Sequence, residues 1–292
     1  MNTPIAIVVL TRDEPDFLQQ TVQSIIERTH YPYELFIVDN HSTSNTQLNM
    51  LQQYDDNSSI HVIFNQSNQW VLGFNQAIKV IRSRSNLSSK HMVLTDGDIV
   101  VPEAIDQLCW LGYLKQKMDQ NIVIGKLGLA LDIHSIKDSE DFQKTYQREY
   151  GYMQGPLLDD LVVAPVDTTL AMYRFDLFVL PSFKMLPGHA SLVKPHYYVC
   201  RTQKYQAIHL GWQNYIEPKK AQLKDKVVCF TKYAGYIDPL VLGKTDVRTR
   251  FFYRFFRYFF KAYWAGLVAW YWLLYIVPRF PRNLNDIQSK LR

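Results

Sequence analysis

Two aspartates separated by a single glycine, Asp96 and Asp98, are the side chains of this sequence best suited to chemistry. They follow the apolar run 92–94 and precede Pro102. Neighbouring carboxylates at the end of a buried strand need a counter-charge, which a divalent cation supplies. Oxygen ligands suit Mg²⁺ or Mn²⁺, and either ion can be shared with a substrate diphosphate. A solvated Asp-Gly turn is the alternative, but the strand before it and the Pro-initiated helix expected after it favour a metal site.

A third carboxylate, Asp39, follows the apolar run 35–38. A carboxylate in this place can accept hydrogen bonds from the N–H groups of a nucleotide base. The same residue could instead cap a following helix. Both interpretations place Asp39 at the end of a strand.

The elements that position these carboxylates alternate between strand and helix patterns. Strands are expected at 5–10, 35–38, 60–64, 92–94 and 122–131, and helices around 18–26, 74–81 and 102–109. This alternation predicts an α/β domain with a largely parallel sheet. Ligands of such sheets bind beyond the carboxyl ends of the strands, which selects 11–12, 39–40 and 96–98. Residues 132–247 are expected to complete the sheet and to form a second wall of the cleft.

Four segments in this order, 7–12, 37–40, 73–77 and 96–98, resemble family 2 glycosyltransferases of the GT-A fold. The resemblance implies a Rossmann-like, mostly parallel sheet flanked by helices. It also implies a hexosyltransferase that uses Mn²⁺ or Mg²⁺ and a nucleotide-sugar donor, with a UDP-sugar favoured. The sequence departs from the pattern at Trp70, where many relatives have glycine.

The resemblance also implies roles for individual residues. Asp39 binds the base of the nucleotide, Asp96 contacts the ribose or, through water, the metal, and Asp98 is the direct metal ligand. Further donor contacts are implied for Thr11, Arg12 and Asn75.

Two segments of the second half resemble elements of bacterial surface-polysaccharide transferases. Residues 164–174 resemble their acceptor-side strand, and 209–212 resembles a later His-Leu-x-Trp element. The resemblance implies that His209 completes the metal site, with a structural histidine as the alternative.

The catalytic base is expected at Asp167, because a carboxylate beside the sugar can deprotonate an acceptor hydroxyl. Asp159 and Asp160 are its rivals. A base at this place favours an inverting reaction, whereas its absence would make a retaining mechanism relevant.

Composition agrees with an enzyme of the reducing cytosol. The chain has 292 residues, of which 47% are hydrophobic and 20% charged, enough for a large core. Its cysteines, Cys109, Cys200 and Cys229, form no spacing that predicts disulfides or a zinc site. The sequence contains neither GxGxxG nor a Walker A loop, which argues against dinucleotide-binding enzymes and NTPases.

The C-terminal segment 248–292 differs from the rest in charge. It contains nine Lys and Arg and one Asp, so it carries +8, whereas the preceding residues carry −3. A helix would place four of the bases on one face among aromatic residues, namely Arg250, Arg254, Arg257 and Lys261. Basic and aromatic side chains together are typical of a helix in a membrane interface.

The uncharged run 262–277 has 16 residues, or about 24 Å of helix, against a hydrocarbon core about 30 Å thick. Immersion without crossing is therefore favoured over a span. A helical hairpin buried in a homodimer is a further alternative. No nucleic-acid partner is expected, because so much exposed Phe, Trp and Leu would be insoluble as an open groove.

We therefore expect a GT-A glycosyltransferase domain over 1–247, with a nucleotide-sugar half over about 1–131 and an acceptor half over about 132–247. Membrane-associating helices are expected over 248–292. The expected reaction adds a sugar to a lipid-linked or surface-glycan acceptor, such as a lipopolysaccharide or capsule precursor. The expected place is the cytoplasmic face of the inner membrane, with anionic lipids as partners. A polyprenyl-phosphate glycosyltransferase and a non-catalytic, nucleotide-binding membrane adaptor are the alternatives.

Overall fold

A computed structural model describes residues 3–88, 90–167, 169–180, 183–187, 192–212, 220–237 and 239–277. The chain forms two compact units. The first comprises residues 1–177 and 195–219, and the second comprises residues 178–194 and 220–292.

The first unit is built on a ten-stranded sheet in the order β3-β2-β1-β4-β9-β6-β10-β8-β7, with β5 paired to β10 beside this path. Parallel pairing joins the four strands at one side: β1 (Ile5–Thr11), β2 (Tyr33–Asp39), β3 (Ile60–Phe64) and β4 (His91–Asp96). The apolar runs of β1, β2 and β4 are buried on both faces, as expected of parallel strands, whereas β3 at the edge of the sheet is only partly buried. This part of the sheet confirms the sequence-based prediction.

The rest of the sheet is mixed. Antiparallel pairing joins three strands to their neighbours: β9 (Leu170–Arg174), β7 (Leu157–Leu158) and β8 (Leu161–Val163). Parallel pairing joins β6 (Ile124–Leu131) and β10 (Tyr198–His209) to each other. The short β5 (Ile99–Val100) is antiparallel to the end of β10. The fold is therefore α/β with a mixed sheet, in which parallel pairing is concentrated in β1 to β4.

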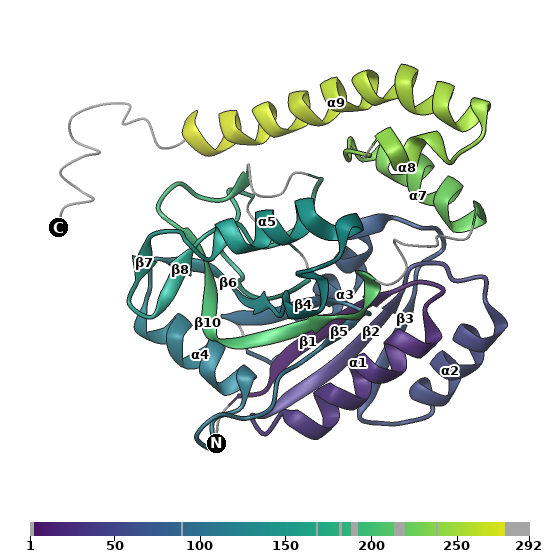
Figure 1. Cartoon of the computed structure of the whole chain (residues 1–292). Coiled ribbons are helices and arrows are strands. Elements are labelled where there is room, and N and C mark those ends of the chain that lie inside the picture. Colours follow the sequence, from purple (N-terminus) through teal and green to yellow (C-terminus); the bar gives the residue numbers. More distant parts are fainter. Residues whose placement is uncertain are drawn as a thin grey trace. The chain divides into compact units, whose positions relative to one another are not determined.

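Helices cover both faces of the sheet (Figure 1). On one face lie α1 (Pro15–Arg28), α2 (Asn45–Asp55) and α4 (Trp110–Gln120), and on the other α3 (Phe74–Arg82) and α5 (Gln143–Tyr152). The helical spacing of Leu18, Val22 and Ile25 puts all three side chains into the core beneath α1. Single 3₁₀ turns occur at η1 (Trp70–Gly73), η2 (His134–Ile136), η3 (Glu140–Phe142) and η5 (Leu210–Trp212).

The prediction of a helix that begins at Pro102 is wrong. Residues 101–109 are irregular, and α4 begins only at Trp110. Asp106 and Gln107 have positive φ angles of 52° and 65°, which close a tight turn between paired Ile105 and Leu108. Both apolar residues pack against the core from this turn, so their helical spacing in the sequence has another cause.

The second unit is helical, with α7 (Lys220–Lys232), α8 (Pro239–Gly243) and α9 (Val247–Ile276). Its small core joins Val227, Ile237, Leu242 and Tyr253, so α7, α8 and the start of α9 pack together around Ile237. Asp246 caps α9 by accepting from the Thr249 N–H at 2.8 Å. Among the described helices, none is long and apolar enough to cross a membrane.

The helix expected in the tail is present, and it begins at the boundary proposed near residue 247. The compact units nevertheless group residues 178–194 and 220–246 with it. The functional division into nucleotide-sugar and acceptor halves stays a prediction.

A buried histidine anchors the amino end of β4. His91 is completely buried, and its Nε2 lies 3.1 Å from the Nη1 of Arg174. The guanidinium is always charged and can only donate, so the imidazole is the acceptor and stays neutral. Burial and, next, the Arg174 charge lower the pKa of His91 from 6.5 to about 4.

This lowered pKa predicts an acid-sensitive fold. Since folding favours the neutral imidazole, its contribution to stability is complete above pH 6.5 and is lost as the pH falls to about 4. The loss is at most about 3 kcal/mol, from 1.36 kcal/mol per pKa unit. Denaturant unfolding between pH 7 and 4 should show a smaller loss for His91→Gln than for wild type. The exposed-site control His30→Gln should follow wild type. An identical pH dependence of the free energy of unfolding in all three proteins would contradict this role of His91.

Candidate active site

The parallel register brings three of the predicted residues to one edge of the sheet. Thr11 ends β1 opposite Asp39, which ends β2, and Leu10 lies opposite Asp96 at the end of β4. Backbone bonds continue this alignment into the loops, since the Asn40 N–H donates to the Thr11 carbonyl at 2.9 Å. The end of the sheet therefore positions the side chains that the sequence predicted to bind a donor.

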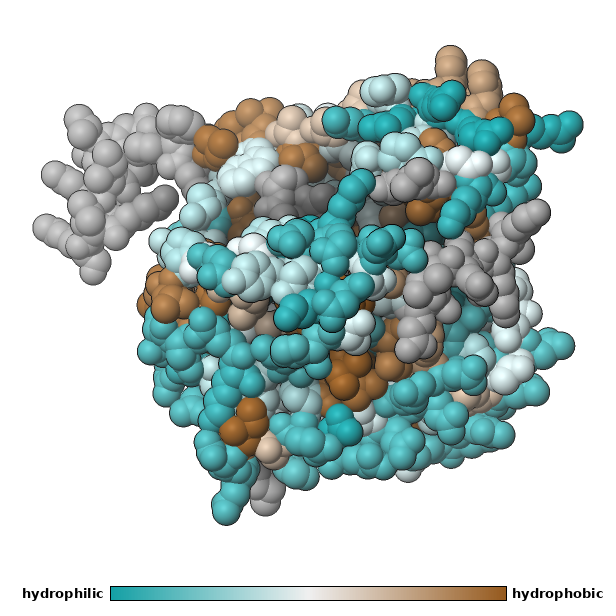
Figure 2. Space-filling view, in the orientation of Figure 1, coloured by the Kyte–Doolittle hydropathy of each residue, from teal (hydrophilic) through white to brown (hydrophobic). Residues whose placement is uncertain are grey.

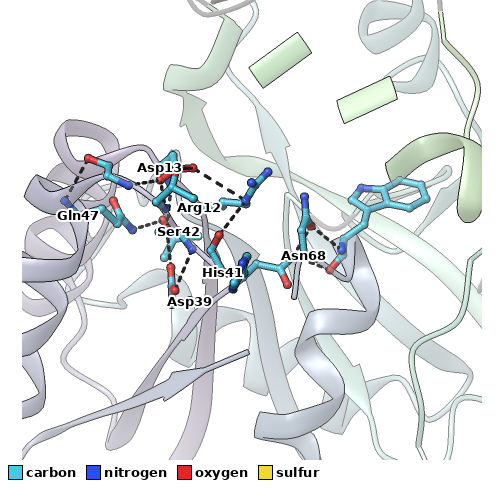
Figure 3. A network of polar contacts seen from close by, with 12 residues as sticks. Arg12, Asp13, Asp39, His41, Ser42, Gln47 and Asn68 are labelled. Carbon is cyan, nitrogen blue, oxygen red and sulfur yellow. Dashed lines mark hydrogen bonds and ion pairs between the residues drawn. The ribbon is translucent and has the colours of Figure 1, made fainter. Parts of the chain in front are cut away.

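The loop after β1 is bonded to the loop after β2 (Figure 3). Asp13 accepts from the Thr43 and Ser44 N–H groups at 2.7 and 2.8 Å, and Arg12 Nε donates to the His41 carbonyl at 3.2 Å. Gln47 donates to the Thr11 hydroxyl at 3.0 Å. These contacts fix Thr11 and Arg12 beside the end of β2.

Asp39 has a structural task in the same loop. Its carboxylate accepts from the Ser42 N–H at 3.0 Å and from the Ser42 hydroxyl at 2.5 Å, and the residue is 2% exposed. The helix that follows is capped by Ser44 instead, so the alternative of a helix cap at Asp39 is wrong. Each carboxylate oxygen has two acceptor positions, so these bonds leave capacity for a ligand N–H.

Asparagines organise the loop before α3. Asn40 donates to the Asn68 side chain at 3.0 Å and accepts from the Asn65 amide at 3.2 Å. Trp70, at the place where many relatives have glycine, has the left-handed φ of 49° that glycine adopts easily. Asn75 follows in the first turn of α3, next to this network. The sequence selected Asn40 only by its place after β2, and Asn65 was not predicted as a site residue, although it directly follows β3.

The predicted metal ligands come together. Asp98 Oδ2 lies 3.8 Å from His209 Nε2, and the two side chains are 14% and 11% exposed. Antiparallel pairing of His209 with Ile99 and a 2.8 Å bond from the Leu210 N–H to the Asp98 carbonyl fix this approach. The His209 ring stacks on the Trp212 indole, with centroids 5.1 Å apart and an interplanar angle of 11°.

Two buried cations hold the segment that carries Asp167. Lys126, 2% exposed, donates from Nζ to the carbonyls of Val166 at 2.6 Å and Asp167 at 3.0 Å. Arg201 donates from Nε to the Pro165 carbonyl at 2.6 Å. Burial lowers the pKa of Lys126 to about 7, and the Asp167 and Asp96 charges partly offset that effect. Asp96 and Asp167 therefore act on one buried lysine.

Neither cation was predicted to belong to the site. The available signal was a lysine inside the apolar run 122–131 and an arginine inside the run that forms β10. The rivals for the catalytic base, Asp159 and Asp160, pair with Lys117 at 2.8 and 2.5 Å. They precede β8, four strands from β4 in the sheet, or about 19 Å at 4.8 Å per strand. The structure thus brings Asp167, and not these two, towards Asp96.

A family model described as glycosyl transferase family 2 matches residues 6–179, more than half of the chain. The chain therefore belongs to this family of glycosyltransferases. The mannosyltransferase PcManGT from Pyrobaculum calidifontis, solved in complex with GDP-Man and Mn²⁺, has a similar structure. Its TM-score is 0.52 at 12% identity, over 92% of this chain and 75% of that one. This likeness concerns the fold, and it confirms the GT-A class.

Two further similarities are more limited. GalNAc-T7, solved with UDP, GalNAc and Mn²⁺, gives a TM-score of 0.49 at 15% identity, over 78% of this chain and 48% of that one. Protein CgeD of Bacillus subtilis (strain 168) is 39% identical over 46 residues, which are 16% of this chain and 11% of CgeD.

Because Gly211 has no side chain, the carboxylate of Asp98 occupies the space that a Cβ at position 211 would fill. A Cβ at this position would overlap Asp98 Oδ2 and would lie 3.0 Å from His209 Cε1. Gly211→Ala should displace the carboxylate and lower sugar transfer at least about tenfold, equivalent to 1.4 kcal/mol. Gly151→Ala is the matched control, since nothing lies within 4 Å of its added Cβ. Equal transfer rates for both variants, with equal thermal stability, would contradict this geometry.

Proposed function

We propose that this glycosyltransferase moves a sugar from a nucleotide-sugar donor to a lipid-linked or surface-glycan acceptor in a divalent-cation-dependent reaction. The observation that carries the proposal is the approach of His209 to Asp98. Asp98 follows the end of β4, beside the loops that hold Thr11 and Asp39. The PcManGT complex, with its nucleotide sugar and Mn²⁺, supports this chemistry for a similar fold.

The two side chains fit a divalent cation. Metal–ligand bonds of about 2.1 Å each span at most about 4.2 Å, and the Asp98–His209 separation is 3.8 Å. His209 Nδ1 is buried without a hydrogen-bond partner among the described residues. The described residues contain no group of three or more His, Cys, Asp and Glu that could hold a metal. Substrate phosphates and water would complete the shell, as Mg²⁺ sites commonly require.

A cation held by Asp98 and His209 would neutralise the charge that grows on the nucleoside diphosphate as it leaves. Asp39 binds the base, and Thr11, Arg12, Asn75 and Asp96 contact the remaining donor. Asp167 takes the proton of the acceptor hydroxyl, which then attacks the anomeric carbon with inversion. Lys126 holds the Asp167 backbone in place for this step.

The metal role is tested by Asp98→Ala. We expect UDP or GDP to raise the melting temperature of the wild-type chain by several degrees with Mn²⁺, because a ligand at 100 times its Kd stabilises by about 2.7 kcal/mol. Asp98→Ala should lose the Mn²⁺-dependent part of this shift and at least about a hundredfold in transfer. The exposed-site control Asp55→Ala should behave as wild type. Near-wild-type activity of Asp98→Ala, or insensitivity of the wild-type chain to EDTA, would contradict the metal assignment. Nucleotide binding without transfer or donor hydrolysis would favour the adaptor.

The site of action is proposed to be the cytoplasmic membrane face, because of the side chains of α9. At 100° per residue, Arg250, Arg254, Arg257 and Lys261 form one stripe. Beside it lies an exposed aromatic stripe: Phe251, Phe255, Tyr258, Phe259 and Tyr263, each 56–66% exposed. Hydrophilic and apolar side chains both reach the surface of this helix in Figure 2. Basic groups can meet anionic headgroups while the aromatic rings enter the interface.

Charge reversal on the full chain tests this membrane proposal. Changing Arg250, Arg254, Arg257 and Lys261 to Glu should weaken binding to anionic vesicles by about 1 kcal/mol per residue. A control with the same net charge reverses four exposed bases of the first unit: Lys79, Arg82, Lys90 and Lys144. High salt should weaken but not abolish wild-type binding, because the aromatic rings remain inserted. Unchanged partition of the α9 variant in a flotation assay would refute the interfacial helix. Truncation at 247 is unsuitable, because Tyr253 belongs to the core of the second unit.

A further inference from the structure

The first unit contains a pocket of about 250 Å³ between α5 and the ends of β6 and β10. No role has been given above to this space. Its floor and rim combine apolar, aromatic and charged side chains, including Ile133, Tyr146, Glu149, Tyr150, Arg201 and Gln206.

The pocket offers an aromatic surface beside a polar base. Tyr146 and Tyr150 stack with centroids 6.0 Å apart and an interplanar angle of 18°. At the base, Arg201 Nη1 pairs with Glu149 Oε2 at 2.6 Å, and these side chains are only 6% and 7% exposed. Besides its bonds to Glu149 and Pro165, the guanidinium has no further hydrogen-bond partner among the described residues.

A buried ion pair in this position has a desolvation cost that apolar residues would avoid. An ion pair in the wall of a pocket can form hydrogen bonds with the hydroxyl groups of a ligand. A pyranose ring has this character, since its C–H face packs on an aromatic ring and its edge carries hydroxyls. The volume lies below the roughly 300–1,000 Å³ of pockets for drug-sized ligands, so one ring fits and a whole glycan does not.

The pocket adjoins the candidate reaction centre on the side away from Asp39. Tyr146 and Ile133 pack against the apolar cluster to which Trp212 belongs, and the Trp212 indole stacks on His209. Arg201 also bonds the carbonyl two residues before Asp167. The end of β2 lies four strands from β6, or about 19 Å, so the base of the donor nucleotide belongs elsewhere.

We propose that this pocket binds one pyranose ring of the acceptor glycan, with Tyr150 as stacking surface and Arg201 as hydrogen-bond donor. The proposal rests on the proposed glycosyltransferase function and names the part of the acceptor that the site recognises. It also gives Arg201 two tasks, because the same guanidinium holds the segment of Asp167. Occupation of the pocket would therefore be coupled, through Arg201, to the backbone segment that precedes Asp167.

Saturation-transfer NMR of the full chain tests the proposal with methyl glycosides of glucose, galactose, mannose and N-acetylglucosamine. At least one glycoside should bind wild type, and Tyr150→Ala should bind it about two- to thirteenfold more weakly, from the roughly 0.5–1.5 kcal/mol of an aromatic contact. Tyr198→Ala is the matched control, because Tyr198 is 50% exposed, Tyr150 is 49% exposed, and Tyr198 does not line the pocket. Binding of UDP and GDP with Mn²⁺ is measured by calorimetry in the same proteins.

Selective loss of glycoside binding in Tyr150→Ala, with unchanged nucleotide affinity, supports the proposal. It is overturned if no glycoside binds wild type, or if Tyr150→Ala and Tyr198→Ala bind alike. It is also overturned if Tyr150→Ala loses nucleotide affinity, because the pocket would then hold the base. Glycoside binding that depends on Tyr150, in a protein that binds no nucleotide, would support a saccharide pocket and contradict the proposed transfer reaction.

Discussion

The short pairing between β5 and the end of β10 is the constraint on which the candidate site depends. Asp98 lies in the turn before β5, and His209 is the last residue of β10, over a hundred positions later in the chain. Two backbone contacts, Ile99 with His209 and Leu210 with Asp98, bring these side chains together. The approach needs no long side chain to reach across the site. It does need a residue without a Cβ at position 211.

The part of the sheet formed by β1 to β4 could be predicted because its signals are local. The runs in β1, β2 and β4 are apolar, and the polar residue that follows each run marks the strand end. Parallel pairing then places Thr11, Asp39 and Asp96 at one edge without further information. The turn at 105–108 shows the limit of such signals. The apolar residues of this turn have helical spacing, but the two residues between them have positive φ angles and form no helix. The residue types of Asp106 and Gln107 do not indicate this conformation.

The part of the sheet that follows β4 was less predictable because its contacts are long-range. Lys126 and Arg201 are buried charges within strands, and the backbone carbonyls that accept from them lie 36 to 41 positions away along the chain. A carbonyl leaves no trace in the sequence, so the anchoring of residues 165–167 could not be inferred. The approach of His209 to Asp98 was expected only through the family resemblance. Spacing alone gives no reason to join them.

The loop around Trp70 has a consequence for the variation of this sequence among its relatives. A bulky residue in the left-handed region costs about 1–2 kcal/mol and persists where surrounding contacts enforce it. Here the Trp70 N–H donates to Asn68 at 3.0 Å and the Trp70 carbonyl accepts from Asn40 at 3.2 Å. The three positions should therefore coevolve. Relatives with a side chain at the position of Trp70 should retain both asparagines.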